Sequence, residues 1–259
     1  MPLRVRGVLL DLEGTLYEAG VPVPGAAAAV ESLSSLGVAH CFITNTTSRP
    51  RSAIARELAA MGIPAEAERI FTAPLAARDY LLARGLTRCH LMVAPAVLED
   101  FAGIEHAQNS PQALVVGDVG EGFSYERMNR AFHLLLEGAE FVTLARNRYY
   151  RGAGGLVLDQ GPFVAALEHA AGREAVLTGK PSSRFFAAAL EALGVPAGRA
   201  AVVGDDVAAD VGGGMALGMR GVLVRTGKFR EADLAASSVA PDAVLGSVAD
   251  LPELLSAAN

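Results

Sequence analysis

The sequence contains few of the residues that build redox centres and transition-metal sites. Its 259 residues include only two cysteines, Cys41 and Cys89. Two cysteines cannot form a disulfide framework, so we expect buried free thiols in a reducing cytoplasm. The five histidines are scattered without a pair at ligand spacing, which argues against a zinc site.

Long apolar runs and basic stripes are missing as well. No stretch approaches the roughly 18 uninterrupted apolar residues that a membrane span needs. The residues before Asp11 do not form the apolar segment of a signal peptide. A formal net charge of -6 and a pI near 5.4 argue against a nucleic-acid surface. We therefore expect a cytoplasmic protein without nucleic-acid or membrane partners.

Lysine is scarce, because the 22 basic residues include only Lys180 and Lys228. In a chain that uses arginine so freely, each lysine suggests a position where arginine does not serve. A compact ammonium fits a small anionic pocket, where a planar guanidinium would crowd it. We expect this role for Lys180 and a surface or structural role for Lys228.

The two ends of the chain alternate apolar strand patterns with helix patterns. Such alternation predicts right-handed β-α-β crossovers and a parallel sheet. The middle of the chain has an alternation of its own. The predicted fold is therefore α/β, with a Rossmann-like parallel sheet core flanked by helices at 1–77 and 177–259 and an inserted α/β domain at 78–176. Core strands are expected at 8–10, 40–43, 200–203 and 221–224, and helices at 24–36, 50–61 and 181–193.

Polar residues stand where predicted strands end or helices begin. Because parallel strands place their carboxyl ends at one edge of a sheet, these residues should converge there. Carboxylates suit Mg²⁺, a hydroxyl and backbone N–H groups suit phosphate, and a lysine offsets the negative charge. The segments are Asp11-x-Glu13-Gly14-Thr15, Thr44-Asn45, Gly179-Lys180-Pro181 and Gly204-Asp205-Asp206 with Asp210.

This combination of groups favours phosphoryl transfer, which needs positioning and charge neutralisation above all. A carboxylate such as Asp11 can attack phosphorus to give an aspartyl phosphate that water later cleaves. Departure of the leaving group and attack of water then require a proton shuttle, and Glu13 is placed for that task two residues further on.

The ordered motifs resemble the haloacid dehalogenase superfamily of phosphatases over essentially the whole chain. The insert between the second and third motifs resembles the C2-type cap of the NagD-like subfamily. Three short sequence segments narrow the resemblance to the branch that contains phospholysine phosphohistidine inorganic pyrophosphate phosphatase. They are Arg148-Tyr149-Tyr150, Gly161-Pro162-Phe163 and Thr226-Gly227-Lys228.

The resemblance implies a role for each motif residue. Asp11 would be the nucleophile and a ligand of Mg²⁺, the implied cofactor. It also implies a small phosphorylated substrate, phosphoamidate or pyrophosphate, and a homodimer formed through the cap. The other implied roles are metal ligation by the Glu13 carbonyl and by Asp205, phosphate binding by Thr44 and the Asn45 backbone, a bridge between nucleophile and phosphate by Lys180, and orientation of Lys180 or of metal-bound waters by Asp206 and Asp210.

Glu13 departs from the superfamily pattern, in which most phosphatases carry Asp at this position. The backbone carbonyl survives the change, whereas a proton shuttle depends on where the carboxyl group lies. Two functions are therefore consistent with the sequence: a slow phosphatase, and a phosphate-binding or regulatory protein without turnover. A receiver-like signalling domain needs no insert of this size, and a Rossmann dehydrogenase would need a Gly-x-Gly-x-x-Gly turn that Gly14 does not begin.

Overall fold

The computed structural model describes residues 3–152 and 154–256, so the outermost residues of the predicted core, 1–2 and 257–259, lie outside the described part. The chain separates by its internal contacts into two compact units. Unit 1 comprises Met1–Thr44, Arg51–Phe71 and Lys180–Asn259, and unit 2 comprises Asn45–Pro50 and Thr72–Gly179. The sequence placed the insert at 78–176, whereas the contacts assign the whole helix α3 (Ala73–Ala83) to unit 2.

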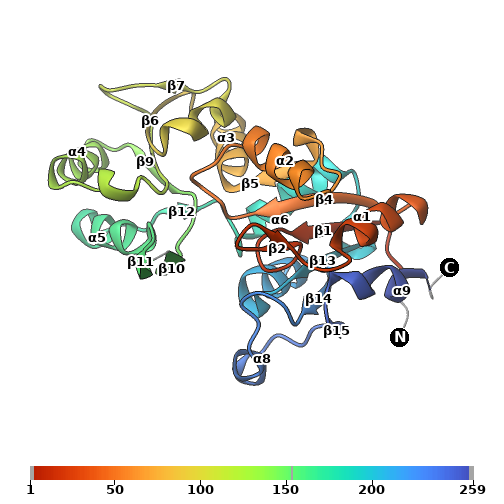
Figure 1. Ribbon diagram of the computed structural model, residues 1–259. Coiled ribbons are helices and arrows are strands. Elements are labelled where there is room, and N and C mark those ends of the chain that lie inside the picture. Colours follow the sequence, from red (N-terminus) through yellow and green to blue (C-terminus); the bar gives the residue numbers. More distant parts are fainter. Residues whose placement is uncertain (1–2, 153, 257–259) are drawn as a thin grey trace. The chain divides into compact units, whose positions relative to one another are not determined.

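Unit 1 is built on a six-stranded sheet in the order β15-β14-β13-β1-β4-β5, and the pairs from β15 to β4 are parallel (Figure 1). Strand β1 is buried along its whole length, as its continuous apolar run predicts for a strand covered on both faces. The strands are β1 (Gly7–Asp11), β4 (Ala39–Thr44), β5 (Ile70–Thr72), β13 (Ala200–Gly204), β14 (Arg220–Val224) and β15 (Ala243–Leu245).

Helices supply the apolar side chains that cover this sheet. Val8 and Leu10 of β1 belong to one core cluster with Val30 of α1, Leu58 of α2 and Leu255 of α9. Helix α6 contacts β1 and β4 and carries two fully buried phenylalanines. The helices of unit 1 are α1 (Ala26–Ser35), α2 (Arg51–Ala60), α6 (Ser183–Leu193), α7 (Gly213–Met215), α8 (Glu231–Ala236) and α9 (Leu251–Ser256).

Unit 2 is a three-layer α/β structure of its own. Its five-stranded sheet has the order β12-β9-β8-β6-β7 with parallel pairs throughout. Helix α3 packs on one face, with Ala77 against Val115, and helices α4 and α5 pack on the other, with Leu134 and Val164 against Leu114. The elements are β6 (Arg88–Met92), β7 (Glu105–His106), β8 (Ala113–Val116), α4 (Tyr125–Leu136), β9 (Glu140–Thr143), α5 (Gly161–Ala171) and β12 (Val176–Leu177).

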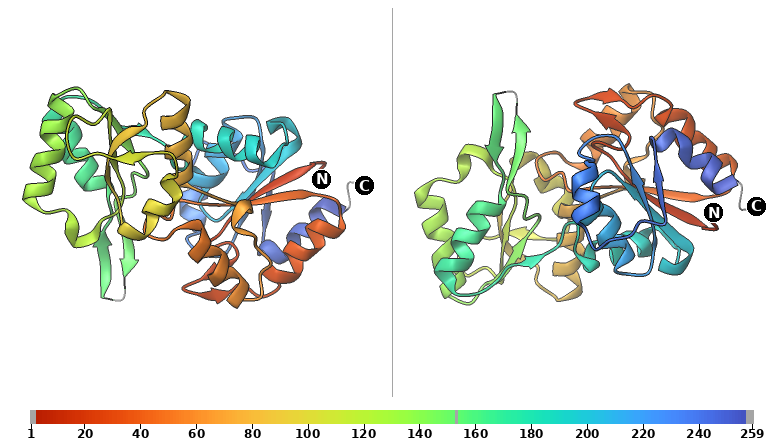
Figure 2. Two further views of the ribbon diagram at one scale, coloured as in Figure 1. Left: turned by 90° about the horizontal axis from the view of Figure 1, so that it is seen from above. Right: turned by 90° about the horizontal axis from the view of Figure 1, so that it is seen from below.

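Two short antiparallel hairpins complete the units. Strands β2 (Tyr17–Glu18) and β3 (Val21–Pro22) follow the Asp11 loop in unit 1. In unit 2, β10 (Tyr149–Gly152) and β11 (Gly155–Leu158) pair with each other and extend away from the five-stranded sheet (Figure 2).

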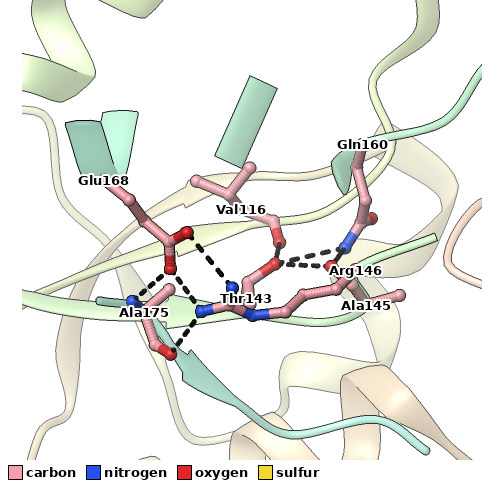
Figure 3. A network of polar contacts seen from close by, with 7 residues as sticks. All are labelled: Val116, Thr143, Ala145, Arg146, Gln160, Glu168 and Ala175. Atoms are coloured by element: carbon pink, nitrogen blue, oxygen red, sulfur yellow. Dashed lines mark hydrogen bonds and ion pairs between the residues drawn. The ribbon is translucent and has the colours of Figure 1, made fainter. Parts of the chain in front are cut away.

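A polar network fixes the chain where it leaves β9 in unit 2 (Figure 3). The Gln160 amide is fully buried and donates to the Ala145 carbonyl at 2.7 Å and to the Thr143 hydroxyl at 3.3 Å. Arg146 pairs with Glu168, whose Oε1 also accepts the Ala175 N–H at 2.8 Å. The segment that runs from Arg146 toward the β10–β11 hairpin therefore begins from a fixed point.

The two parallel sheets with flanking helices confirm the predicted fold class. Among residues 3–152 and 154–256, no helix combines the length and apolarity needed to cross a membrane. Cys41 and Cys89 are both free and buried, and burial raises their pKa to about 12 and about 11.

Candidate active site

Asp11 lies at the carboxyl end of β1 and is almost fully buried. Both of its carboxylate oxygens have donors within unit 1. The Lys180 ammonium lies 2.5 Å from Oδ1, and the Thr15 hydroxyl donates to Oδ2 at 3.2 Å. Lys180 is itself only 6% exposed. A buried carboxylate held at both oxygens is oriented, so it can present an oxygen to an incoming group in a fixed direction.

Asp205 comes directly after β13, the strand beside β1. Because these strands run parallel with Leu10 opposite Val203, the residues that follow them share one edge of the sheet. Carboxylate oxygens of Asp11, Asp205 and Asp210 lie within 4.8 Å of one another, and all three residues are buried. The sequence-predicted carboxylates of two distant motifs are thus brought into one cluster.

Gly14 allows this close approach. Its φ of 89° lies in the left-handed region, and an added Cβ would collide with the Asp205 carboxylate. A side chain at this position would therefore separate the Asp11 loop from Asp205.

The helical segment after Asp205 places Asp206 and Asp210 differently. Asp206 caps the π-helical turn Val207–Gly212, and its Oδ1 accepts the N–H groups of Ala208 and Ala209 at 3.0 and 2.9 Å. Asp210 points back into the cluster, where its Oδ1 lies 2.6 Å from the Lys180 ammonium. Lys180 therefore bridges Asp11 and Asp210.

The cluster carries more negative than positive charge. Burial, together with the carboxylates of Asp11 and Asp210, raises the pKa of Asp205 to about 7. Burial opposes the charge of Lys180, but the neighbouring Asp11 and Asp210 carboxylates raise its pKa above the ordinary value. Three buried carboxylates with one ammonium leave negative charge uncompensated, and a further cation would neutralise it.

The donor set suits Mg²⁺, which prefers carboxylate oxygens and a small number of protein ligands. No sulfur or imidazole contributes to the three-carboxylate group, so the chemistry of the ligands favours a hard cation over zinc.

Three further predicted site residues lie at or next to the same strand ends. Thr44 is the last residue of β4 and is buried. Asn45 follows it in the chain, in unit 2. Glu13 is exposed, and its Oε1 accepts the Ala19 N–H at 2.9 Å, so the carboxylate is engaged by the turn of the β2–β3 hairpin.

Sequence reasoning did not assign roles to all the residues that touch the cluster. The Thr15 hydroxyl was part of a quoted motif, but its bond to Asp11 was not foreseen. The backbone N–H of Lys228 donates to Asp205 Oδ2 at 2.6 Å. The polar turn after the buried strand β14 could have indicated that Lys228 lies near Asp205, because β14 ends at the same edge as β13.

Gly179, directly before Lys180, offers a test of local packing. An added Cβ would overlap the Leu144 carbonyl and lie 2.7 Å from Asn45 Oδ1. Gly179→Ala is expected to lower the free energy of unfolding by about 1–3 kcal/mol. It should also lower turnover by up to about 10²-fold, because it would shift Lys180 and Asn45, two of the predicted site residues. Gly198→Ala is the matched control for thermal unfolding and turnover, since nothing lies within 4 Å of its added Cβ. Equal behaviour of the two variants would contradict this packing.

Known proteins are similar to this chain in sequence and in fold. The profile described as haloacid dehalogenase-like hydrolase matches residues 8–105, and one described as HAD-hydrolase-like matches residues 177–251. Phospholysine phosphohistidine inorganic pyrophosphate phosphatase of Rattus norvegicus is 39% identical over 257 residues, which cover 97% of this chain and 94% of the rat protein.

Solved structures of phosphatases and of NagD are similar to this chain in fold. The p-nitrophenyl phosphatase of Archaeoglobus fulgidus matches with a TM-score of 0.92 and 27% identity, over 98% of this chain and 100% of its own. NagD of E. coli K-12, at 24% identity, shares the fold with a TM-score of 0.89, over 96% of this chain and 98% of its own.

The fold, the buried aspartate cluster and these relatives define the class of the protein, which is a phosphoric ester hydrolase. The chain belongs to the haloacid dehalogenase-like hydrolase family. The resemblance inferred from four short motifs is thereby confirmed, including its NagD-like architecture with an inserted α/β unit.

Proposed function

We propose that this phosphatase is Mg²⁺-dependent and hydrolyses a small phosphorylated metabolite, a phosphoamidate or pyrophosphate through an aspartyl phosphate on Asp11. One observation carries the proposal: a buried carboxylate at a strand end, held by Lys180 and Thr15 beside Asp205 and Asp210. The name of the rat relative, which refers to phospholysine, phosphohistidine and inorganic pyrophosphate, supports this choice of substrate classes.

Asp11 would carry the covalent chemistry. One of its oxygens attacks phosphorus, the bond from phosphorus to the leaving atom breaks, and the leaving group takes the bonding electrons and a proton. Water then attacks phosphorus, which releases phosphate and restores the carboxylate. Lys180 would offset the charge of the phosphoryl group while it holds Oδ1 of Asp11.

Asp11, Asp205 and the Glu13 backbone carbonyl would hold Mg²⁺. When bound, the cation withdraws charge from the phosphoryl oxygens and offsets the repulsion within the acidic cluster. Asp210 would keep Lys180 oriented through its 2.6 Å contact, and Asp206 would fix the helical turn that carries Asp210.

The phosphoryl group itself would be bound by the Thr44 hydroxyl and the Asn45 backbone. Strand β4 runs parallel to β1 with Asp11 opposite Ile43, so Thr44 leaves the sheet at the edge where Asp11 lies. We further propose that unit 2 is a C2-type cap that sets substrate choice and mediates a homodimer, and that the protein is cytoplasmic.

Glu13 would shuttle protons, and its removal should distinguish among leaving groups. Glu13→Gln is expected to lower turnover of a phosphoamidate or pyrophosphate by about 10²–10⁴-fold, the range of general acid–base catalysis. The loss should be smaller with para-nitrophenyl phosphate, whose leaving group needs little protonation. Steady-state kinetics on the three substrates measure the ratio. An equal loss on all of them would mean that Glu13 serves the hairpin through its bond to Ala19 and not proton transfer.

Mg²⁺ should stabilise the protein in a pH-dependent way. The pKa of Asp205 rises from 3.8 to about 7 on folding, so its contribution to stability is complete below 3.8 and is lost as pH rises toward 7. A bound cation can take the place of the proton. Mg²⁺ should therefore raise the melting temperature more on the alkaline than on the acidic side of pH 7. The same increase on both sides, measured by thermal unfolding, would contradict a site that includes Asp205.

The direct test of the proposed activity is hydrolysis of para-nitrophenyl phosphate, pyrophosphate and a phosphoamidate with and without Mg²⁺. Turnover that requires Mg²⁺ supports the proposal, and the order of the three rates identifies the leaving group that the site accepts best. Binding of Mg²⁺ and phosphate without any hydrolysis would instead favour a regulatory phosphate-binding protein, the alternative that the engaged Glu13 carboxylate keeps open.

A further inference from the structure

The turn Thr226–Lys228 follows β14, and each of its residues donates a hydrogen bond to another segment of unit 1. Strand β14 is the neighbour of β13, so this turn leaves the sheet beside Asp205. Its contacts are the Thr226 hydroxyl donating to the Gly14 carbonyl at 2.5 Å, the Gly227 N–H donating to Glu18 Oε1 at 2.6 Å, and the Lys228 N–H donating to Asp205 Oδ2 at 2.6 Å.

Two of these contacts reach segments that carry the proposed metal ligands. The Lys228 N–H fixes one oxygen of Asp205 through a backbone donor, which no side-chain rotation can withdraw. The Thr226 hydroxyl donates to the carbonyl of Gly14. Gly14 follows Glu13, and the Glu13 carbonyl is the proposed metal ligand. The turn therefore links the Gly14 backbone of the Asp11 loop to Asp205 through two hydrogen bonds.

Gly227 packs so closely against Asp205 and Gly14 that no side chain fits between them. Its φ is 63°, and an added Cβ would collide with both the Asp205 carboxylate and the Gly14 backbone. Glycine is thus needed here for two reasons, a left-handed backbone and close packing against two proposed ligand segments. The Glu18 contact adds the β2–β3 hairpin to the same assembly.

We infer that the Thr226–Lys228 turn is a positioning element, which sets the distance between Asp205 and the Glu13–Gly14 backbone and so determines the affinity for Mg²⁺. The inference rests on the proposed function, in which these groups bind the cation. The residues of the turn act through Asp205 and Gly14. A turn with a purely structural role would alter stability and leave metal affinity unchanged.

Thr226→Val tests the hydroxyl alone, because valine keeps the β-branched shape and removes the donor. Calorimetric titration with Mg²⁺ should show affinity weakened by about 10–100-fold, the range found when a partner of a metal ligand is lost. Thr226→Ser keeps the donor and should restore binding to near the wild-type value. This rescue separates the hydrogen bond from the packing of the methyl group.

Gly227→Ala tests the close approach, with Gly218→Ala as its matched control. Both glycines have positive φ values, 63° and 85°, so alanine strains the backbone at each. Nothing lies within 4 Å of an added Cβ at Gly218, whereas Gly227 faces Asp205. Gly227→Ala should weaken Mg²⁺ binding at least about tenfold, and Gly218→Ala should leave it unchanged.

The outcomes separate this inference from the proposed function. Wild-type protein that does not bind Mg²⁺ in the titration overturns the proposed metal site and the inference with it. Wild-type binding with unchanged affinity in Thr226→Val overturns the inference alone. Weakened binding in Thr226→Val, restored in Thr226→Ser, supports it. Thr226→Val preserves the volume of the side chain, so it remains informative if Gly227→Ala does not fold.

Discussion

Replacing Asp11 by asparagine should abolish Mg²⁺-dependent hydrolysis, with a loss of at least about 10³-fold on every substrate. The amide has nearly the same shape but lacks the carboxylate oxygen that is proposed to attack phosphorus. It also removes a negative charge from a cluster in which Lys180 lies 2.5 Å from Oδ1. The measurement is the initial rate with para-nitrophenyl phosphate, pyrophosphate and a phosphoamidate at saturating Mg²⁺.

An Asp-to-Asn change outside the cluster provides the control. Asp118 lies in unit 2, where its Oδ1 accepts the N–H of Gly120 at 2.8 Å in a local turn. Asp118→Asn should retain full turnover. Residual Asp11→Asn activity within a few-fold of the wild type would show that another group attacks phosphorus.

Replacing Lys180 should cost both stability and activity. Lys180→Met leaves Asp11 and Asp210 buried without their shared ammonium, and breaking a buried ion pair from one side costs about 3–5 kcal/mol. The cost should shrink as the pH falls, because the abandoned carboxylates then take up protons. Turnover should also be lost, since the ammonium that is proposed to offset the phosphoryl charge beside Asp11 would be missing. Denaturant unfolding at several pH values measures the first effect, and initial rates measure the second.

Two comparisons make the Lys180 result specific. Arg220 forms an exposed ion pair with Asp242 at 2.9 Å, and Arg220→Met should cost at most about 1 kcal/mol. Lys180→Arg keeps the charge but should not restore turnover, because a planar guanidinium does not fit where a point charge bridges two carboxylates. If Lys180→Met were as stable as the wild type, the ion pairs would not hold the cluster together.

The positions of Asp11, Asp205 and Thr44 could be predicted because two simple rules suffice. An apolar run that ends in a polar residue marks a buried parallel strand, and the ends of such strands share one edge. The same reasoning brought Lys180 to the cluster. Its position just before α6 follows from a Gly-Lys-Pro break ahead of an amphipathic helix.

Other features depend on contacts that leave no periodic pattern in the sequence. Helix α3 follows the short strand β5, and neither was predicted, because Ile70–Thr72 is too short to be distinguished from a turn. The bond from Thr226 to Gly14 joins residues that are 212 positions apart. The direction of the Glu13 carboxylate could not be predicted from the sequence either, since it depends on the Ala19 N–H in a hairpin of two-residue strands.

The most direct measurement is mass spectrometry of the peptide that contains Asp11 after rapid acid quenching of a single turnover. The account predicts one phosphoryl group on Asp11 that appears with Mg²⁺ and substrate, disappears when the reaction is allowed to continue, and is absent from Asp11→Asn. Complete hydrolysis of substrate with no phosphorylated peptide at any quench time would contradict it, because water would then attack the substrate directly.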